Sequence, residues 1–258
     1  MARVLITGAS RGLGRSLAIV LSQRGHEVIA SARHITDLAD LEATSKMTLD
    51  VTSPASIAAA LAEIGEVNVV INNAALVVEG PVEAIPIEVV QSMFETNVFG
   101  PLRVIQAVLP SMRERRHGMI VNITSLATQF APPLQGVYSA TKTALERLSE
   151  ALWFETRHFG VRVVVVASGG IRTGILTRQK RFSLDPYTPL IEQCEARLTK
   201  YNAQERGAPP EQVASAIADL IEQSIPSRRI LVGAQAEKLL ARLGGRLTSR
   251  LTRLGLKW

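Results

Sequence analysis

Short, continuous apolar runs alternate along the chain with longer stretches in which apolar residues recur every three to four positions. The short runs have the length of strands that are covered on both faces, and the longer stretches have the period of amphipathic helices. This alternation predicts an α/β fold with a parallel sheet and helices on both of its faces. The predicted strands are residues 3–7, 27–31, 46–49, 68–72, 119–124, 161–167 and 229–232, and the predicted helices include residues 14–24, 54–63, 88–115 and 137–158.

The alternation continues without a linker or a break in composition, so we predict one domain over residues 1–236. Residues 171–207 interrupt it with polar, basic and aromatic side chains where a short connection would suffice. Long insertions at the end of a strand are commonly lids or substrate loops, and we predict that role for this segment. The end of the chain, residues 237–258, forms a separate basic tail.

The formal net charge of +6 is concentrated in this tail, where six lysines and arginines accompany the single acid Glu237. The rest of the chain is close to neutral, which argues against a broad nucleic-acid-binding face. Leucines fall mostly four apart in the tail and form an apolar stripe flanked by arginines. We favour a helix that packs on its own domain or on a partner subunit, with contact to anionic lipid as the alternative.

Cysteine and histidine usage excludes two kinds of site. Cys194 is the one cysteine, so the chain has no intrachain disulfide. The four histidines are scattered without ligand spacing, and we predict no metal site. No apolar run approaches the ~20 residues of a membrane-spanning helix, and the first apolar run is too short for a signal peptide. We therefore expect a cytoplasmic protein.

The first predicted strand runs directly into a glycine-rich turn, Thr7-Gly8-Ala9-Ser10-Arg11-Gly12-Leu13-Gly14, and a helical pattern follows. Glycines let the backbone bend sharply here and approach a pyrophosphate closely. The start of the helix offers unpaired N–H groups and a partial positive charge to the phosphates. A plain tight turn is the alternative, but the position between a strand and a helix favours a dinucleotide site.

The end of the second predicted strand indicates which dinucleotide binds. NAD-binding folds usually place a carboxylate here for the adenosine ribose hydroxyls. This chain has Arg33 there and no acidic residue, and Arg11 in the glycine turn adds a second positive charge. An arginine pairs well with a phosphate, whereas a carboxylate would repel it. We therefore predict NADP(H), with two solvated surface arginines as the alternative.

Tyr138 and Lys142 are four residues apart and therefore lie on one face of a predicted helix. A free tyrosine has a pKa of ~10 and is a poor acid or base near neutral pH. A neighbouring ammonium group is expected to lower that pKa, which suits proton transfer to a carbonyl oxygen. Such a pair arises often by chance, but Ser125 lies thirteen residues upstream at the end of the strand 119–124, where such folds bind ligands.

Taken together, these motifs resemble the short-chain dehydrogenase/reductase family. The pattern from Pro210-Glu211-Gln212-Val213 through Arg228-Arg229-Ile230-Leu231-Val232-Gly233 resembles its 17β-hydroxysteroid and retinol dehydrogenase-like branch. The glycine turn has the family pattern Thr-Gly-x-x-x-Gly-x-Gly, and Asn97 precedes Ser125, Tyr138 and Lys142 in the family's order and spacing. Asp50-Val51 after the third strand and Asn72-Asn73-Ala74 after the fourth also match.

The resemblance implies a single-domain Rossmann fold with a seven-stranded parallel sheet in the order 3-2-1-4-5-6-7. It also implies that residues 1–236 bind NADP(H) and catalyse the reaction. It implies hydride transfer between a carbonyl and a secondary alcohol. Tyr138 would be the acid/base, Ser125 would bond the substrate oxygen, Lys142 would hold the nicotinamide ribose, and Asn97 would keep a water in a proton relay. The implied cofactor contacts, besides Arg33, Tyr138 and Lys142, are Gly8, Ser10, Arg11, Gly12, Leu13, Gly14, Asp50, Val51, Asn73, Ala74, Ile171 and Thr173.

The family resemblance also implies a homodimer or homotetramer through the helices near 101–116 and 137–158. Residues expected on the substrate side are mostly apolar, so we predict a hydrophobic ketone or alcohol as the small-molecule substrate. The alternative function is a non-catalytic dinucleotide sensor or scaffold of the same fold. The intact set of Asn97, Ser125, Tyr138 and Lys142 favours the enzyme. The expected substrate-side residues are Leu126, Ala127, Gln129, Phe130, Leu134 and Gln135.

Overall fold

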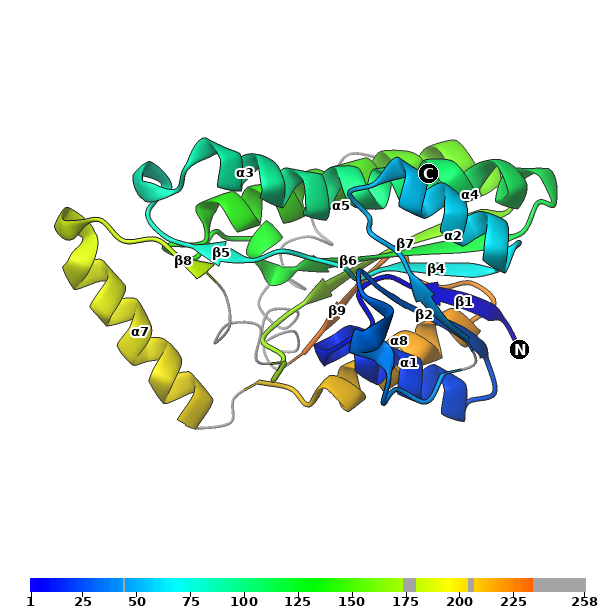
Figure 1. Cartoon of the computed structure of the whole chain (residues 1–258), viewed down its shortest axis with the longest axis horizontal. Helices are drawn as coiled ribbons and strands as arrows, with labels where there is room; N and C mark the ends of the chain where they lie inside the picture. The colour runs from blue at the N-terminus through cyan, green and yellow to red at the C-terminus, as the bar shows by residue number, and fades with distance from the viewer. Residues whose placement is uncertain (44, 174–179, 204–206, 234–258) are drawn as a thin grey trace, which may run out of the picture.

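The computed structural model describes residues 1–43, 45–173, 180–203 and 207–233. Seven parallel strands form one sheet in the order β3-β2-β1-β4-β6-β7-β9 (Figure 1). Counted without the short strands β5 (Val78–Glu79) and β8 (Lys180–Arg181), which pair with each other, this order confirms the prediction. The strands of the main sheet are β1 (Arg3–Ile6), β2 (Glu27–Ala32), β3 (Ser45–Thr48), β4 (Val69–Asn72), β6 (Gly118–Ser125), β7 (Val161–Ser168) and β9 (Arg229–Val232).

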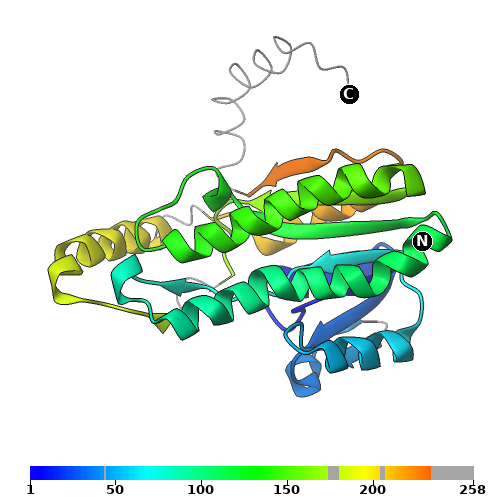
Figure 2. The same cartoon turned by 90° about the horizontal axis from the view of Figure 1, so that it is seen from above.

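Helices cover both faces of the sheet, as predicted (Figures 1 and 2). One face carries α1 (Gly12–Gln23) and α8 (Pro210–Glu222), and the other carries α2 (Pro54–Ile64), α4 (Gly100–Glu114) and α5 (Gly136–Thr156). α3 (Ile87–Phe94) precedes α4, and α7 (Thr188–Ala203) extends from the domain at the end that also carries β5 and β8. The 3-10 turns are η1 (Ile35–Leu38), η2 (Val82–Ala84), η4 (Leu126–Thr128), η5 (Arg157–Phe159) and η6 (Asp185–Tyr187).

The sheet separates two apolar cores, because neighbouring residues of a strand point to opposite faces. In β1, Val4 and Ile6 are fully buried in the core with α1 and α8, and Leu5 between them is fully buried in the core on the other face. Since the strands are parallel, the residues that follow each strand meet at one edge of the sheet. The predicted motifs after β1, β2, β4 and β6 are brought together at this edge.

The predicted helix over residues 88–115 is helical throughout but is divided. A π-helical turn, η3 (Glu95–Phe99), separates α3 from α4. Pro101 has no backbone N–H and therefore cannot bond the carbonyl of Asn97 in the regular α-helical way. Asn97, in this wider turn, is completely buried.

The segment predicted as a substrate loop, residues 171–207, is described except for 174–179 and 204–206. It begins with a bridge between Ile171 and Ala208 and continues through β8 and α7. The tail, residues 237–258, lies outside the described residues, so its predicted packing stays a prediction. In the part of the chain that is described, no helix has both the length and the apolar character needed to cross a bilayer.

Candidate active site

The glycine turn joins β1 to α1 and packs tightly against the chain after β4. Gly8 and Gly12 have φ angles of +69° and +56°, in the left-handed region that favours glycine. A β-carbon added to Gly8 would lie 2.8 Å from the Cα of Ala74, and one added to Gly14 would overlap the carbonyl oxygen of Gly8. Packing and backbone conformation therefore both require glycine in this turn.

Asn73, which directly follows β4, is hydrogen-bonded to the glycine turn. Its Nδ2 atom donates to the carbonyl oxygens of Thr7 and Gly8, both at 3.0 Å. The Thr7 hydroxyl oxygen in turn accepts bonds from the backbone N–H groups of Asn73 (3.0 Å) and Ala74 (3.1 Å). Asn73 and Ala74 thus lie against the predicted dinucleotide turn, and they also fix its shape.

Arg11 and Arg33 lie at the ends of neighbouring elements. Arg11 is the residue before α1, and Arg33 directly follows β2. Both are exposed, and among the described residues neither pairs with a carboxylate. Asp50 follows β3, and its Oδ1 atom accepts bonds from the N–H and hydroxyl of Thr52, so this oxygen is used within the local turn.

The remaining predicted cofactor contacts differ in exposure. Thr173 lies beside the glycine turn, since a β-carbon added to Gly12 would be 3.1 Å from the Cβ of Thr173. Leu13 is buried in the core with α1 and α8, so its side chain serves packing. Val51 is buried in the opposite core. Ser10 and Ile171 are half-buried.

Ser125, Tyr138 and Lys142 come together where β6 ends and α5 begins. The Ser125 side chain lies beside the Tyr138 hydroxyl, and its Oγ atom accepts a bond from the N–H of Ala127 at 3.1 Å. The Lys142 ammonium donates to the carbonyl of Ile123 at 2.9 Å and lies 5.9 Å from the centroid of the Tyr138 ring. The predicted grouping of these three side chains is therefore present.

The pKa values of this pair correct one expectation. The sequence predicts that Lys142 lowers the pKa of Tyr138, but burial raises the pKa of Tyr138 to about 12, opposed in part by the nearby Ser125 hydroxyl. Burial likewise lowers the pKa of Lys142 to about 8. Both shifts disfavour the charged form, because both side chains are taken out of water. At neutral pH the tyrosine is protonated and most of the lysine is still an ammonium ion.

Asn97 lies close to the first turn of α5, and both polar atoms of its side chain are already hydrogen-bonded within the protein. Its Oδ1 atom accepts a bond from the N–H of Leu76 at 2.7 Å. Its Nδ2 atom donates to the carbonyl of Leu76 at 2.8 Å and to the hydroxyl of Thr141 at 3.0 Å. The Thr141 hydroxyl donates to the carbonyl of Tyr138 at 2.7 Å, so Asn97 is linked to the first turn of α5.

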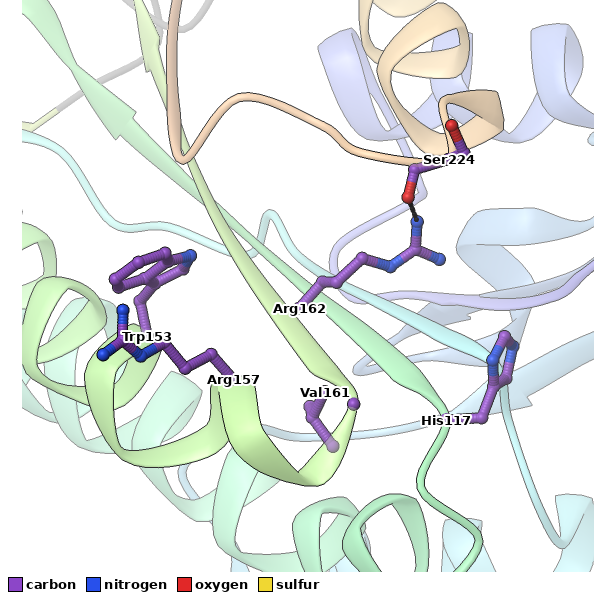
Figure 3. Close-up of a pocket in the computed structure, with 7 residues that line it drawn as sticks. His117, Trp153, Arg157, Val161, Arg162 and Ser224 are labelled. Carbon is purple, nitrogen blue, oxygen red and sulfur yellow. Dashed lines mark hydrogen bonds between the residues drawn. The ribbon is translucent and has the colours of Figure 1, made fainter. Parts of the chain in front are cut away.

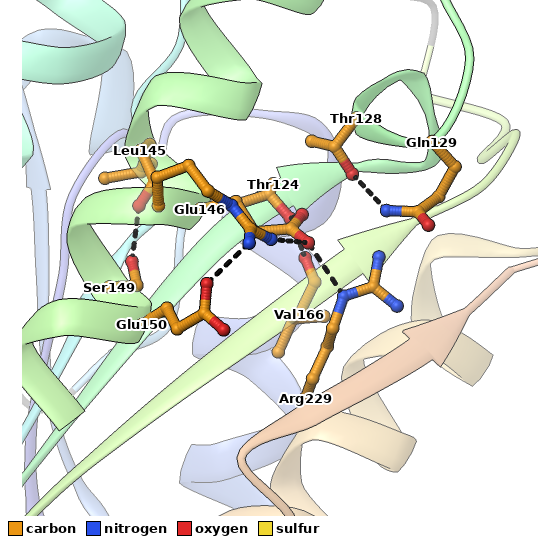
Figure 4. A network of polar contacts seen from close by, with 10 residues as sticks. Thr124, Thr128, Gln129, Leu145, Glu146, Ser149, Glu150, Val166 and Arg229 are labelled. Atoms are coloured by element: carbon orange, nitrogen blue, oxygen red, sulfur yellow. Dashed lines mark hydrogen bonds and ion pairs between the residues drawn. The ribbon is translucent and has the colours of Figure 1, made fainter. Parts of the chain in front are cut away.

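A buried carboxylate that the sequence reasoning missed anchors α5 to the sheet (Figure 4). Glu146 is 3% exposed and accepts a bond from Nε of Arg229 in β9 at 2.9 Å. Its other oxygen is 3.5 Å from the hydroxyl of Thr124 in β6. Glu146 lies one helical turn beyond Lys142, and that four-residue spacing on the buried face of α5 is the signal that could have identified it.

The surface hollow in Figure 3 lies at the opposite edge of the sheet, where β6 and β7 begin. Arg162 beside it donates to the carbonyls of Gln223 at 2.9 Å and Ser224 at 3.3 Å. None of the predicted site residues lines this hollow, so it is separate from the candidate site. It has a volume of about 500 Å³ and is lined by His117, Trp153, Arg157, Gly160, Val161, Arg162 and Ser224.

The sequence is similar to those of known proteins over nearly the whole chain. The family model described as short chain dehydrogenase matches residues 2–183. The chain is 32% identical over 266 residues to a 3-ketodihydrosphingosine reductase of Bacteroides thetaiotaomicron, a match that covers 98% of this chain and 96% of that protein. It is 36% identical over 183 residues to human retinol dehydrogenase 8, a match that covers 66% of this chain and 59% of the human protein.

Solved structures agree with these relatives in both fold and sequence. A short-chain dehydrogenase from Streptomyces avermitilis superposes with a TM-score of 0.82 at 33% identity, covering 98% of this chain and 96% of that one. A short-chain dehydrogenase from Burkholderia cenocepacia in complex with NADP superposes with a TM-score of 0.76 at 26% identity, covering 97% and 96%. The chain therefore belongs to the short-chain dehydrogenase/reductase family of oxidoreductases, in its retinol dehydrogenase-like branch.

Proposed function

We propose that this protein is an NADP(H)-dependent oxidoreductase that interconverts a carbonyl and a secondary alcohol. The observation that carries the proposal is the grouping of Ser125 and Tyr138 with the Lys142 ammonium, which lies 5.9 Å from the tyrosine ring. This group lies at the same sheet edge as the glycine turn. Reduction of a carbonyl requires a proton donor, a bond to the substrate oxygen and a hydride carrier, and this edge offers a place for each.

The residues present fit a phosphorylated dinucleotide, which supplies the hydride when bound. The glycine turn and the start of α1 would hold its pyrophosphate, because they exclude side chains and offer unpaired N–H groups. Arg11 and Arg33, which pair with no carboxylate among the described residues, would hold the adenosine phosphate that distinguishes NADP(H) from NAD(H). The remaining proposed contacts are to Ser10, Leu13, Asp50, Val51, Asn73, Ala74, Ile171 and Thr173.

Tyr138 would act as the acid in the reducing direction. With a pKa of about 12 it carries its proton at neutral pH and can donate it to the substrate oxygen as negative charge develops there. Ser125 would bond the same oxygen and orient it. The Lys142 ammonium would stabilise the negative charge that the proton transfer leaves on the tyrosine oxygen.

Asn97 would take part through its backbone. Its side-chain atoms are already bonded to Leu76 and Thr141. In the regular α-helical register its carbonyl oxygen would face Pro101, which has no N–H, and we propose that this oxygen holds a relay water. Protons would then be returned to Tyr138 through that water.

The substrate that we propose is a hydrophobic ketone or alcohol. The half-buried Tyr138 ring packs against an apolar cluster that includes Val78, Met93 and Val137, so one side of the proton donor is apolar. Two relatives are named for 3-ketodihydrosphingosine and for retinol, which supports this substrate class.

A panel of hydrophobic and hydrophilic ketones tests the proposal, with consumption of NADPH or NADH followed by absorbance. We expect turnover of hydrophobic ketones with NADPH preferred. Tight NADPH binding without turnover of any ketone or of the corresponding alcohols with NADP⁺ would instead favour the sensor or scaffold.

We also propose that the protein assembles as a homodimer or homotetramer through α4 and α5. Leu148 on α5 is 42% exposed and gives that helix an apolar surface position. Light scattering on the purified protein measures the mass, and a monomer at micromolar concentration would contradict this proposal.

A further inference from the structure

The short strand β5 contacts both the loop that begins α5 and the chain beyond residue 180. β5 and β8 pair in parallel, with Glu79 opposite Arg181. The N–H of Phe182 donates to the carbonyl of Glu79 at 2.8 Å. This small sheet lies at the end of the domain from which α7 extends (Figure 1). The backbone near Glu79 therefore holds residues 180–182, within the segment predicted to cover the substrate.

The Glu79 carboxylate joins two separate parts of the chain. One oxygen accepts a bond from Nε2 of Gln135 at 2.6 Å, and the other lies 3.3 Å from Nε of Arg181. The Glu79 side chain is only 12% exposed, so both interactions are partly shielded from water. Arg181 also donates to Glu195 of α7 at 3.1 Å, which extends the connection into that helix.

Gln135 is the residue directly before α5, three positions before Tyr138. Its carbonyl accepts the N–H of Ser139 at 2.8 Å and so forms part of the first helical turn. The preceding residue, Leu134, has a φ angle of +67°, in the left-handed region, and its carbonyl accepts the N–H of Gly80 at 2.9 Å. Residues 79–80 therefore hold this loop through both backbone and side-chain bonds.

The chain beyond residue 180 also reaches the apolar surroundings of Tyr138. Phe182 and Tyr138 pack against the same buried cluster, which includes Val78 and Val137. A β-carbon added to Gly80 would lie 2.9 Å from the carbonyl oxygen of Phe182, so the two segments are in close contact. A displacement of β8 would therefore change the contacts at the start of α5.

We propose that Glu79 is a positioning residue with two linked roles. It holds residues 180–200 in position over the substrate, and it holds the start of α5 that carries Tyr138. Its interaction with Arg181 holds the covering segment, and its bond with Gln135 holds the first turn of α5. Glu79 touches neither the substrate nor the cofactor in this account. The inference rests on the proposed function, because it assigns these residues to the substrate side of that site.

Two substitutions separate the two roles of the carboxylate. Glu79→Gln keeps an acceptor for Gln135 but removes the charge that attracts Arg181. We expect it to raise KM for the ketone about tenfold and to leave kcat within about twofold. Glu79→Ala removes both interactions, and we expect it to raise KM and also to lower kcat about tenfold, because Tyr138 is then less well placed.

Glu83→Ala is the matched control. Glu83 accepts a bond from the Tyr187 hydroxyl at 2.7 Å, so it contacts the same covering segment, but the contact is exposed and does not reach α5. We expect its kcat and KM to stay within about twofold of the wild-type values. Glu79→Gln introduced into an Arg181→Met background should cause no further rise in KM, because the partner of the lost charge is already absent.

Limited digestion with trypsin gives a readout that needs no turnover. Cleavage between residues 180 and 200 should be several-fold faster in Glu79→Gln than in the wild type or Glu83→Ala, because the segment is less firmly held. If the wild type reduced no carbonyl but this cleavage pattern held, the proposed function would fail while the holding role of Glu79 stood. Wild-type KM and wild-type digestion in Glu79→Gln would overturn the inference, as would equal loss of stability in both Glu79 variants without a change in KM.

Discussion

Replacing Glu146 by alanine removes the buried carboxylate that ties α5 to β9. Glu146 is 4% exposed in its side chain, and it pairs with Arg229 at 2.9 Å. Removing one partner of a buried ion pair costs about 3–5 kcal/mol, because the other charge remains without compensation. Arg229 is 31% exposed and can partly reach water. We therefore expect a loss at the lower end, about 3 kcal/mol of the free energy of unfolding.

Equilibrium urea unfolding at fixed protein concentration measures this loss, with far-UV circular dichroism as the signal. Glu150→Ala is the control, because Glu150 lies one turn further along α5 and pairs only on the surface with Arg147, at 53% exposure. An exposed pair of this kind contributes about 0–1 kcal/mol. Equal losses in the two variants, or a loss below about 1 kcal/mol for Glu146→Ala, would refute the assigned role of the buried pair.

Three further predictions concern the cofactor and pH. Gly14→Ala should weaken NADPH binding at least tenfold, because the added β-carbon would overlap the Gly8 carbonyl and displace the turn. Fluorescence titration measures this affinity, and an unchanged Kd would contradict the tight packing. Arg33→Glu should weaken NADPH binding about 10- to 100-fold and leave NADH binding within about threefold, since a carboxylate repels the additional phosphate; equal losses for both cofactors would contradict the assignment. The rate of ketone reduction should fall as the pH rises through about 8, where Lys142 loses its proton, well below the pKa of Tyr138 at about 12. A Lys142→Arg variant that is still active should lack this fall, and a flat wild-type profile between pH 7 and 10 would exclude the role of the ammonium.

The fold could be predicted because its strands are covered on both faces and therefore occur as continuous apolar runs. The run at residues 163–167, for example, lies within β7 (Val161–Ser168). The turn after β1 could be predicted because only glycine tolerates its backbone and its packing. The position of Ser125 at the ligand-binding edge followed from the parallel sheet, and its grouping with Tyr138 was implied by the family resemblance.

Other features depend on contacts between distant segments and could not be predicted. A glutamate within a helix is normally solvated, and Glu146 is buried because β9 brings Arg229 to it from 83 residues away. The pKa of Tyr138 is raised by burial against segments such as β5 and α3, which lie far from Tyr138 in the sequence. Pro101 was a visible signal for the π-helical turn, but the helical period continues across it.

Single-turnover reduction of a hydrophobic ketone by NADPH, in wild type and Tyr138→Phe, tests the central claim most directly. The substitution keeps the ring and its packing but removes the proton donor. We expect the rate of the chemical step to fall about 10²- to 10⁴-fold, while the Kd for NADPH stays within about threefold. A Tyr138→Phe protein that reduces the ketone at the wild-type rate would contradict the account, because the proton would then come from another group.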